Sequence, residues 1–197
     1  MQRAGRVILI GGSSHVGKTT LAGRLAERPG WSARSTDYLA RHPGRPWRHP
    51  PDTLPPHVGE HYLSLDVEDL IASVLGHYRG LWPVVETIIR EHAEDSSKSC
   101  LVLEGSALLP DLVARLAIPG VSAVWLIGDE GLFPSRIHAE SRYEEAEGDI
   151  RAMIDKFVAR TVRFNGMIQD DVARFDLPSI TVDADSSVEA LAGLWQS

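Results

Sequence analysis

Val7-Ile8-Leu9-Ile10-Gly11-Gly12-Ser13-Ser14-His15-Val16-Gly17-Lys18-Thr19-Thr20 is an apolar run that leads directly into the pattern G-x-x-x-x-G-K-T. This pattern is typical of a loop that binds phosphate, because the N–H groups of the loop and of the following helix converge on phosphate oxygens. Lys18 is expected to reach the terminal phosphates and Thr19 to offer its hydroxyl to Mg²⁺. The alternative is a glycine-rich turn without a nucleotide. The predicted phosphate contacts are Gly12, Ser13, Ser14, His15, Val16, Gly17, Lys18, Thr19 and Thr20.

The residues on either side of this loop have the patterns of a strand and a helix. A β-branched apolar run precedes it, and Leu21, Ala22 and Leu25 then recur at helical spacing as far as Pro29-Gly30. Further along the chain, apolar runs alternate with helical patterns, as in a parallel sheet with helical crossovers. The predicted strands are 6–10, 32–36, 100–103, 123–127 and 179–182. The predicted helices are 18–28, 67–78, 81–93, 111–116, 132–147, 149–175 and 187–195.

The composition limits the classes of protein to which the chain can belong. Its 197 residues, 43% of them hydrophobic, suffice for one domain over 1–197, with room for a small lid or insert. A formal net charge of -7 argues against nucleic-acid binding, which needs a basic surface. The single cysteine, Cys100, excludes an internal disulfide. No apolar stretch approaches the ~20 residues that span a bilayer, and the polar start differs from a signal peptide, so we expect a cytoplasmic protein with no membrane partner.

A segment rich in proline and histidine follows the second predicted strand. Six of the twelve prolines and four of the eight histidines lie between residues 41 and 61, and regular helix or central strand is excluded over 41–52. Because ligands bind at the carboxyl edge of open parallel sheets, we expect this segment to shape the substrate site. Trp47 would form an aromatic wall there, with Tyr62, Tyr78 and Trp82 as further candidates and ordinary core packing as the alternative. The histidine spacings match no zinc motif. The predicted basic pocket for an acidic or phosphorylated substrate consists of Arg41, Arg45 and Arg48.

With the first strand, the phosphate-binding loop and these later segments, the chain resembles the P-loop small-molecule kinases of the nucleoside and nucleotide kinase type. This group includes chloramphenicol phosphotransferase-like, gluconate kinase-like, shikimate kinase-like and 2-phosphoglycerate kinase-like proteins. The resemblance is close over residues 6–28 and is one of pattern elsewhere. It implies a three-layer α/β sandwich around a five-stranded parallel sheet of order 2-3-1-4-5. It also implies ATP with Mg²⁺ as phosphate donor, an acceptor-binding insert at about 38–95 and a lid at about 130–150.

Two acidic residues occupy positions that carry functional carboxylates in such kinases. Asp37 follows the second strand, where an acidic residue commonly accepts the proton of the acceptor hydroxyl. The alternative is that Asp37 caps the turn or helix beginning at Tyr38. Glu104 ends a buried strand, where it would contact Mg²⁺ or the acceptor. The alternative is a carboxylate satisfied locally by Ser106 or loop amides.

Three arginines in the second half of the chain are candidates to bind phosphate. Arg136 and Arg142 resemble lid arginines, which close on the nucleotide in related kinases. On one continuous helix they would point about 120° apart, so either the helix breaks or only one of them acts. Arg160 shares a helix face with Lys156 and Arg163 and is expected to face the phosphates from the far side of the lid. Exposed positions and local ion pairs are the alternatives.

These features together predict an ATP-dependent phosphotransferase that acts on a hydroxyl of a small molecule. The acceptor would be a polar metabolite, a nucleoside or an antibiotic, the last in a self-resistance kinase. GTP is left open as a donor, although no Asn-Lys-x-Asp guanine motif precedes the last predicted helix. The competing hypotheses are a nucleotide kinase and a regulatory nucleotide-binding protein without a small-molecule acceptor. We expect a monomer or a homodimer.

Overall fold

The computed structural model describes residues 5–39, 42–48, 53–129, 131–186 and 193. Within these residues, five strands form one sheet, and every hydrogen-bonded pair of strands is parallel. The strand order is β2-β3-β1-β4-β5. The predicted fold class and strand order are confirmed. The strands are β1 (Val7–Gly12), β2 (Trp31–Ser35), β3 (Cys100–Glu104), β4 (Val121–Gly128) and β5 (Ser179–Val182).

Strand β1 is the middle strand, and its side chains alternate between the two faces of the sheet. Val7 and Leu9 belong to one buried cluster, whereas Ile8 and Ile10 belong to the other. All four side chains are at most 3% exposed. Because both faces are covered, the strand is a continuous apolar run rather than an alternation of apolar and polar residues.

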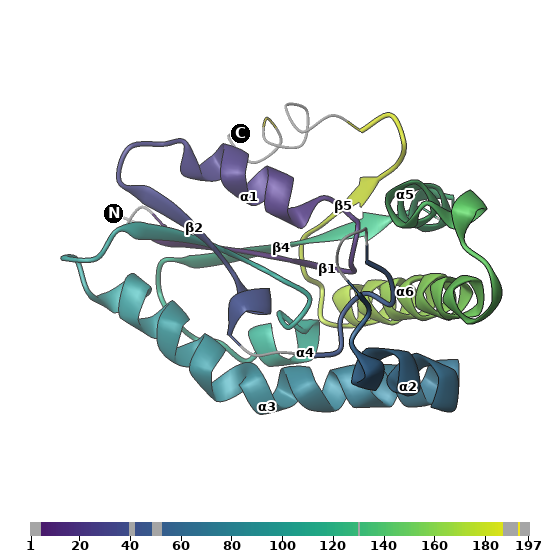
Figure 1. Cartoon of the computed structure of the whole chain (residues 1–197). Helices are drawn as coiled ribbons and strands as arrows, with labels where there is room; N and C mark the ends of the chain where they lie inside the picture. Colours follow the sequence, from purple (N-terminus) through teal and green to yellow (C-terminus); the bar gives the residue numbers. More distant parts are fainter. Residues whose placement is uncertain (1–4, 40–41, 49–52, 130, 187–192, 194–197) are drawn as a thin grey trace.

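Helices cover both faces of the sheet and complete three layers (Figure 1). Helix α1 (Lys18–Ala26) packs with Ile8 and Ile10, and α5 (Leu132–Ser141) contributes to the same cluster. Helices α3 (Val67–Glu94) and α4 (Pro110–Val113) contribute to the opposite cluster. The 27-residue helix α6 (Gly148–Arg174) belongs to both clusters, and α2 (Pro56–Ser64) packs against it. None of the described helices is long and apolar enough to cross a membrane.

Helix α3 differs from the prediction because it is continuous where two helices, 67–78 and 81–93, are predicted. Pro83 lies inside it and removes one backbone hydrogen bond. The helix nevertheless continues, because a buried apolar stripe on both sides of Pro83 stabilises it against the sheet. The stripe consists of Leu70, Ile71, Val74, Val85, Ile89 and Ala93.

Two further differences concern short helices. No helix is predicted over α2, since its buried side consists of only Val58 and Tyr62 and it follows the proline-rich segment. The predicted helix 132–147 stops at Ser141, because Arg142 has a left-handed φ of 54°, and a short 3₁₀ turn, Tyr143–Glu145, follows it. The predicted last helix, 187–195, lies almost wholly outside the described residues.

Polar contacts from α6 fix the carboxyl edge of the sheet. The buried side chain of Asn165 donates to the carbonyl of Gly128 and accepts from its N–H, both at 3.0 Å. Lys156 Nζ donates to three carbonyls at the end of α2, at 2.8 to 3.3 Å. A lysine at this place also complements the negative end of the helix dipole. Helix α6 therefore holds both β4 and α2. The three carbonyls belong to Tyr62, Leu63 and Leu65.

Candidate active site

The loop between β1 and α1 is held in place by buried contacts on its inner side. Val16 is fully buried, and Ser13, 1% exposed, donates its hydroxyl to the carbonyl of Thr161 at 3.1 Å. Gly17 has a φ of 104°, which glycine adopts without strain, and this turn starts helix α1. The loop is thus fixed to α6 and leaves its outer side free to face an anion at the N-terminus of α1.

Lys18 lies within this loop rather than on the surface. Its side chain is 8% exposed, and Nζ donates to the carbonyl of Ser13 at 2.7 Å. Burial lowers the pKa of Lys18, while the carboxylates of Glu104 and Asp37 act in the opposite direction. The ammonium group is therefore held in place by the loop with two carboxylates nearby, and a phosphate could take up its remaining donors.

Thr19 and Glu104 come together at the carboxyl end of β3. The Thr19 hydroxyl donates to Glu104 Oε1 at 3.0 Å, and Glu104 is 3% exposed. Hydroxyl and carboxylate oxygens are hard ligands of the kind that Mg²⁺ prefers, usually with water completing its shell. The two side chains therefore fit a Mg²⁺ ion beside the phosphate-binding loop.

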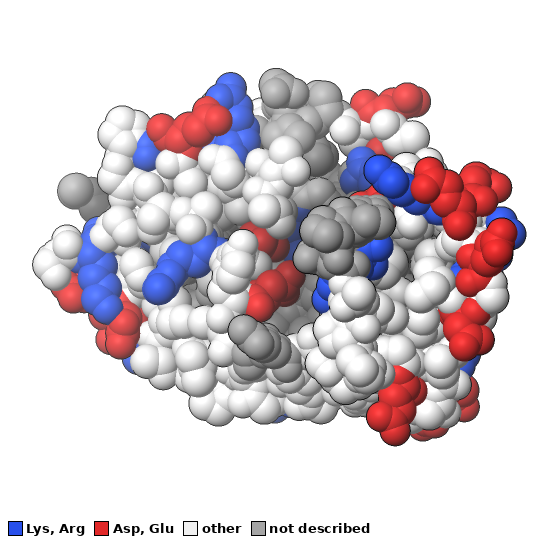
Figure 2. Space-filling view, in the orientation of Figure 1, with Lys and Arg blue, Asp and Glu red and all other residues white. Residues whose placement is uncertain are grey.

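A cavity of about 320 Å³ lies over the loop and the start of α1. Besides Lys18, Thr19 and Glu104 it is lined by two arginines, Arg45 and Arg136. We refer to it as the phosphate cavity. Figure 2 shows acidic and basic side chains facing one another across a hollow near the centre of this face. The other loop and helix residues on its wall are Ser14, His15, Gly17 and Thr20.

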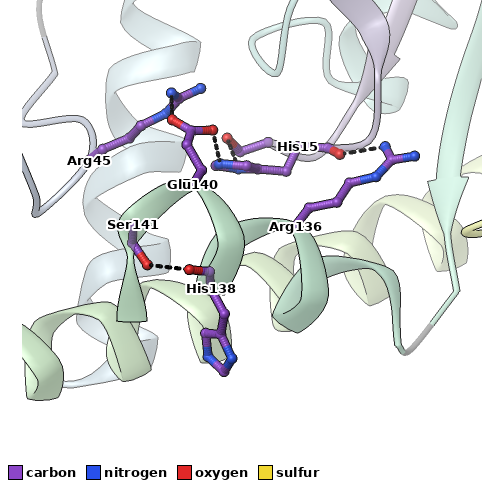
Figure 3. A network of polar contacts seen from close by, with 7 residues as sticks. His15, Arg45, Arg136, His138, Glu140 and Ser141 are labelled. Atoms are coloured by element: carbon purple, nitrogen blue, oxygen red, sulfur yellow. Dashed lines mark hydrogen bonds and ion pairs between the residues drawn. The ribbon is translucent and has the colours of Figure 1, made fainter. Parts of the chain in front are cut away.

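Helix α5 is tied to this loop through polar contacts (Figure 3). Arg136 donates to the carbonyl of His15 at 2.9 Å. Glu140, on the same helix, forms an ion pair with Arg45, and its other oxygen lies 3.0 Å from Nε2 of His15. Burial and the charge of Arg45 lower the pKa of His15 to about 4, against the opposing effect of Glu140. His15 is thus uncharged at neutral pH.

A second cavity, of about 290 Å³, adjoins the phosphate cavity. Its walls come from the ends of β2 and β3, the loop at 42–45, the middle of α3 and helix α6. We refer to it as the acceptor cavity. Four residues line both cavities, so the two spaces meet. The shared residues are Ser14, Asp37, Arg45 and Ser106.

Asp37 is placed between the cavities by a 3₁₀ turn, Thr36–Tyr38. Ser35 caps this turn by accepting from the N–H of Asp37, so the carboxylate of Asp37 is not the cap. A glycine at position 105, with φ of 152°, lets the turn approach the end of β3 closely. A Cβ there would come within 1.8 Å of Thr36 Oγ1. The exposed carboxylate makes no hydrogen bond with any described residue and faces both cavities.

Arg160 and two histidines line the acceptor cavity. Arg160 is 8% exposed and donates to the hydroxyl of Tyr62 at 3.1 Å. Burial, assisted by the charge of Arg160, lowers the pKa of His42 to about 3. Burial also raises the pKa of Tyr78 to about 12, with Arg160 opposing this shift. The cavity therefore contains uncharged hydrogen-bonding groups and one guanidinium besides Arg45.

No protein-family model matches the sequence, and no curated protein matches it significantly. Among solved structures, the gluconokinase from Sinorhizobium meliloti 1021 superposes with a TM-score of 0.50 at 21% identity, over 98% of this chain and 94% of that one. The thymidylate kinase from Candida albicans superposes with a TM-score of 0.50 at 14% identity, over 98% and 90%. The fold is that of the P-loop kinases.

This P-loop kinase fold brings most of the predicted site residues together. Lys18, Thr19, Asp37, Glu104, Arg45 and Arg136 line the phosphate cavity. Arg160 lines the acceptor cavity and not the phosphate cavity, which differs from its predicted place. Of the predicted loop residues, Gly12, Ser13 and Val16 do not line the phosphate cavity, and the last two are buried below the loop surface.

Other predicted residues do not reach either cavity. Arg142 ends α5, and its exposed side chain lies 3.6 Å from Glu145. Arg48 is exposed and donates to backbone carbonyls of its own loop. Trp47 is 5% exposed and packs against Phe157 at a ring distance of 5.0 Å, because burial of this large apolar ring stabilises the loop. Arg41 lies outside the described residues.

Neighbours of Arg160 on α6 do not share its role. Lys156 holds the end of α2, as described above, and Arg163 pairs with Glu68 on the surface at 3.0 Å. The three basic residues follow helical spacing, yet α6 has different partners on each side. The three residues of the predicted basic face therefore have three different sets of contacts and do not face one ligand together.

Sequence reasoning missed the places of three residues of the site, His77, Ser106 and Glu140. His77 lies between Val74 and Leu81 on the cavity side of α3, next to the predicted Tyr78, so a polar residue within an apolar stripe was the signal. Ser106 follows Glu104 by two residues. The role of Glu140 has no local signal, because its partners His15 and Arg45 are 125 and 95 residues away.

Proposed function

We propose that the protein transfers the γ-phosphate of ATP to a hydroxyl of a small molecule. The observation that carries this proposal is the wall shared by the two cavities, formed by Ser14, Asp37, Arg45 and Ser106. A donor phosphate over the loop and an acceptor in the second cavity would meet at this wall. Phosphoryl transfer depends mainly on such positioning and on neutralisation of charge.

The roles of the side chains follow from their places. Lys18 and the N–H groups of the loop bind the terminal phosphates, and Arg136 adds positive charge. The acceptor oxygen forms a bond to the γ-phosphorus while the bond from that phosphorus to the bridging oxygen breaks, and ADP leaves. The hydroxyl proton passes to the carboxylate of Asp37. Thr19 and Glu104 are the residues that would hold Mg²⁺, which would supply positive charge to neutralise the phosphates.

The segments around the cavities have corresponding roles in this proposal. Residues 38–95 form the acceptor-binding insert, since the loop at 42–45 and helix α3 supply walls of the acceptor cavity. Residues 130–150 form the lid, since α5 contacts the phosphate loop through Arg136 and Glu140. A cytoplasmic location, a monomeric or homodimeric state and a role against an antibiotic remain predictions.

A phosphotransfer assay tests the proposal. The purified protein is incubated with ATP, Mg²⁺ and a panel of hydroxylated metabolites, nucleosides and antibiotics, and products are detected by mass spectrometry. Lys18→Ala should lower kcat/KM about 100-fold or more, because a donor to the transferring phosphate is lost. Asp37→Asn should lower kcat about 100-fold or more and leave ATP affinity within a few-fold, because Asp37 lies outside the loop.

Asp170→Asn is the matched control, since Asp170 is exposed on the distant part of α6. Its activity should equal that of the wild type. Tight ATP binding without any acceptor-dependent product would reject the phosphotransferase and favour a regulatory nucleotide-binding protein. An equal loss of ATP affinity in Asp37→Asn would reject the role of Asp37 as a base.

A further inference from the structure

Arg160 is a buried cation that uses little of its hydrogen-bonding capacity. Its guanidinium carries five N–H donors, and one nitrogen donates to the hydroxyl of Tyr62 at 3.1 Å. It stacks over the ring of Phe157, 4.6 Å from the centroid. Among the residues that the structure describes, no carboxylate forms an ion pair with it. The remaining donors belong to a side chain that lines the acceptor cavity.

A cation in such a place needs an anion. Taking a charge out of water is costly unless it is paired, and aromatic rings compensate only in part. Asp37 and Arg160 line the same cavity, yet they are not paired with each other. The other arginine of this cavity, Arg45, already has Glu140 as partner. Arg160 is thus the guanidinium in this cavity that is left available for an anion brought by a ligand.

His42 complements such a ligand without adding charge, because burial lowers the pKa of its imidazole to about 3. His42 and His77 both line the cavity, and their rings lie 5.1 Å apart. An uncharged imidazole offers one donor and one acceptor, which suits hydroxyl groups. Nε2 of His42 is buried and has no hydrogen-bond partner among the described residues. No group of three or more His, Cys, Asp or Glu within the described residues is arranged to hold a metal ion.

The volume of the cavity limits the size of that ligand. At about 290 Å³, the cavity is near the small end of the ligand pockets of proteins, which span roughly 300–1,000 Å³. A short hydroxylated chain with one acidic group suits this space.

We propose that the acceptor is a small hydroxylated anion whose acidic group binds Arg160 while its reacting hydroxyl lies at Asp37. This inference rests on the proposed function, because it assigns the second cavity to the acceptor. The acidic group is a carboxylate or a phosphate, both of which match the planar donor set of a guanidinium. Arg160 then selects the acceptor and fixes its orientation.

Binding measured by calorimetry without nucleotide tests the subsite. D-gluconate probes the carboxylate and glycerol 3-phosphate the phosphate, and D-glucitol and glycerol are their uncharged counterparts. At least one anion should bind tenfold or more tightly than its uncharged counterpart. Arg160→Gln should weaken that anion about 10- to 100-fold, as expected for hydrogen bonds to a charged group. Arg163→Gln, one helical turn on and exposed, should not weaken it.

Two further variants keep the test decisive if Arg160→Gln perturbs folding. Arg160→Lys retains the charge and should recover part of the lost affinity. Tyr62→Phe removes the hydroxyl that accepts from Arg160 and donates to the carbonyl of Gly44, and it should retain the preference for the anion because the guanidinium is still present. Melting temperatures of all variants are compared with the wild type. A preference for neither anion, or a preference that survives in folded Arg160→Gln, would overturn the subsite.

The same probes separate this inference from the proposed function. Phosphorylation of glycerol or D-glucitol but of neither anion would keep the phosphotransferase and reject the anion subsite. Binding of an anion that depends on Arg160, with no phosphoryl transfer to any compound, would keep the subsite and reject the phosphotransferase.

Discussion

At the scale of single residues, the site is marked by ionisable groups whose charged forms are disfavoured. Burial lowers the pKa of His15 to about 4 and that of His42 to about 3, and it raises the pKa of Tyr78 to about 12. Such shifts indicate walls that exclude much of the water. Electrostatic interactions with a bound phosphate are stronger in such surroundings than at an open surface.

The histidines make stability depend on pH. The folded-state pKa of His42 lies below the unfolded value of 6.5, so the unfolded state binds more protons between about pH 3 and 6.5. The contribution of His42 is complete above pH 6.5 and is lost as the pH falls. From pH 7 to pH 5, wild type should lose on the order of 1 kcal/mol more than His42→Gln, allowing for partial exposure. Urea denaturation at both pH values measures the difference.

His57→Gln serves as the control, because His57 is exposed on α2. Its urea midpoints should follow those of the wild type. Parallel midpoints for wild type and His42→Gln at pH 7 and pH 5 would contradict the assignment of His42 as a histidine that is held uncharged.

The residues of the site could be predicted where the chemistry is local. Lys18, Thr19 and Glu104 follow from the loop pattern and from the end of a buried strand. The position of Asp37 can be predicted from the end of β2. That its carboxylate does not cap the turn depends on Ser35, which caps the turn instead, and on Gly105, which lets Thr36 approach the end of β3. Contacts such as His15 to Glu140 join distant segments, and one sequence contains no signal for them.

At the scale of elements, the strands were predictable and the helical connections were less so. Buried parallel strands are short apolar runs, which a sequence displays directly. Helices α2 and α3 depend on tertiary contacts instead, since α2 has few apolar residues and α3 contains Pro83. Packing against the sheet and α6 decides their form, and propensity does not reveal it.

Lys156 should be a main support of α2. Replacing it by Met removes a charged donor from three carbonyls at the end of that helix, so Lys156→Met should lower the free energy of unfolding by about 1–3 kcal/mol. Urea denaturation measures the loss. Lys98→Met is matched in chemistry but removes only an exposed ion pair with Glu91, which should cost less than about 1 kcal/mol. Equal losses in both variants would contradict the role of Lys156.

At the scale of the whole molecule, the two cavities lie at the carboxyl edge of one sheet but depend on different elements. The phosphate cavity is formed by the loop after β1 and by α5, whereas α3 and α6 supply much of the acceptor cavity. Binding in one cavity should therefore be distinguishable from binding in the other. The four residues that line both cavities are the place where the two spaces meet.

Hydrogen exchange should show this division. ATP with Mg²⁺ should slow amide exchange in residues 13–20 and in α5, because bound phosphates fix the loop that these elements contact. An acceptor should slow exchange in residues 74–81 of α3 and in the loop at 42–45. The Lys18→Ala variant is the control and should lose the first pattern and keep the second. Protection of α3 by nucleotide alone would contradict the assignment of the cavities.

The position of β1 in the middle of the sheet has a consequence for how such a protein can change over generations. The loop that follows β1 continues directly from the middle strand of the sheet, and the buried residues Ser13 and Val16 restrict its conformation further. Much of the wall of the acceptor cavity comes instead from the loop at 42–45 and from helices α3 and α6. Substitutions on the loop at 42–45, α3 and α6 leave the middle strand untouched, so the acceptor cavity can change its lining while the loop after β1 keeps its buried contacts.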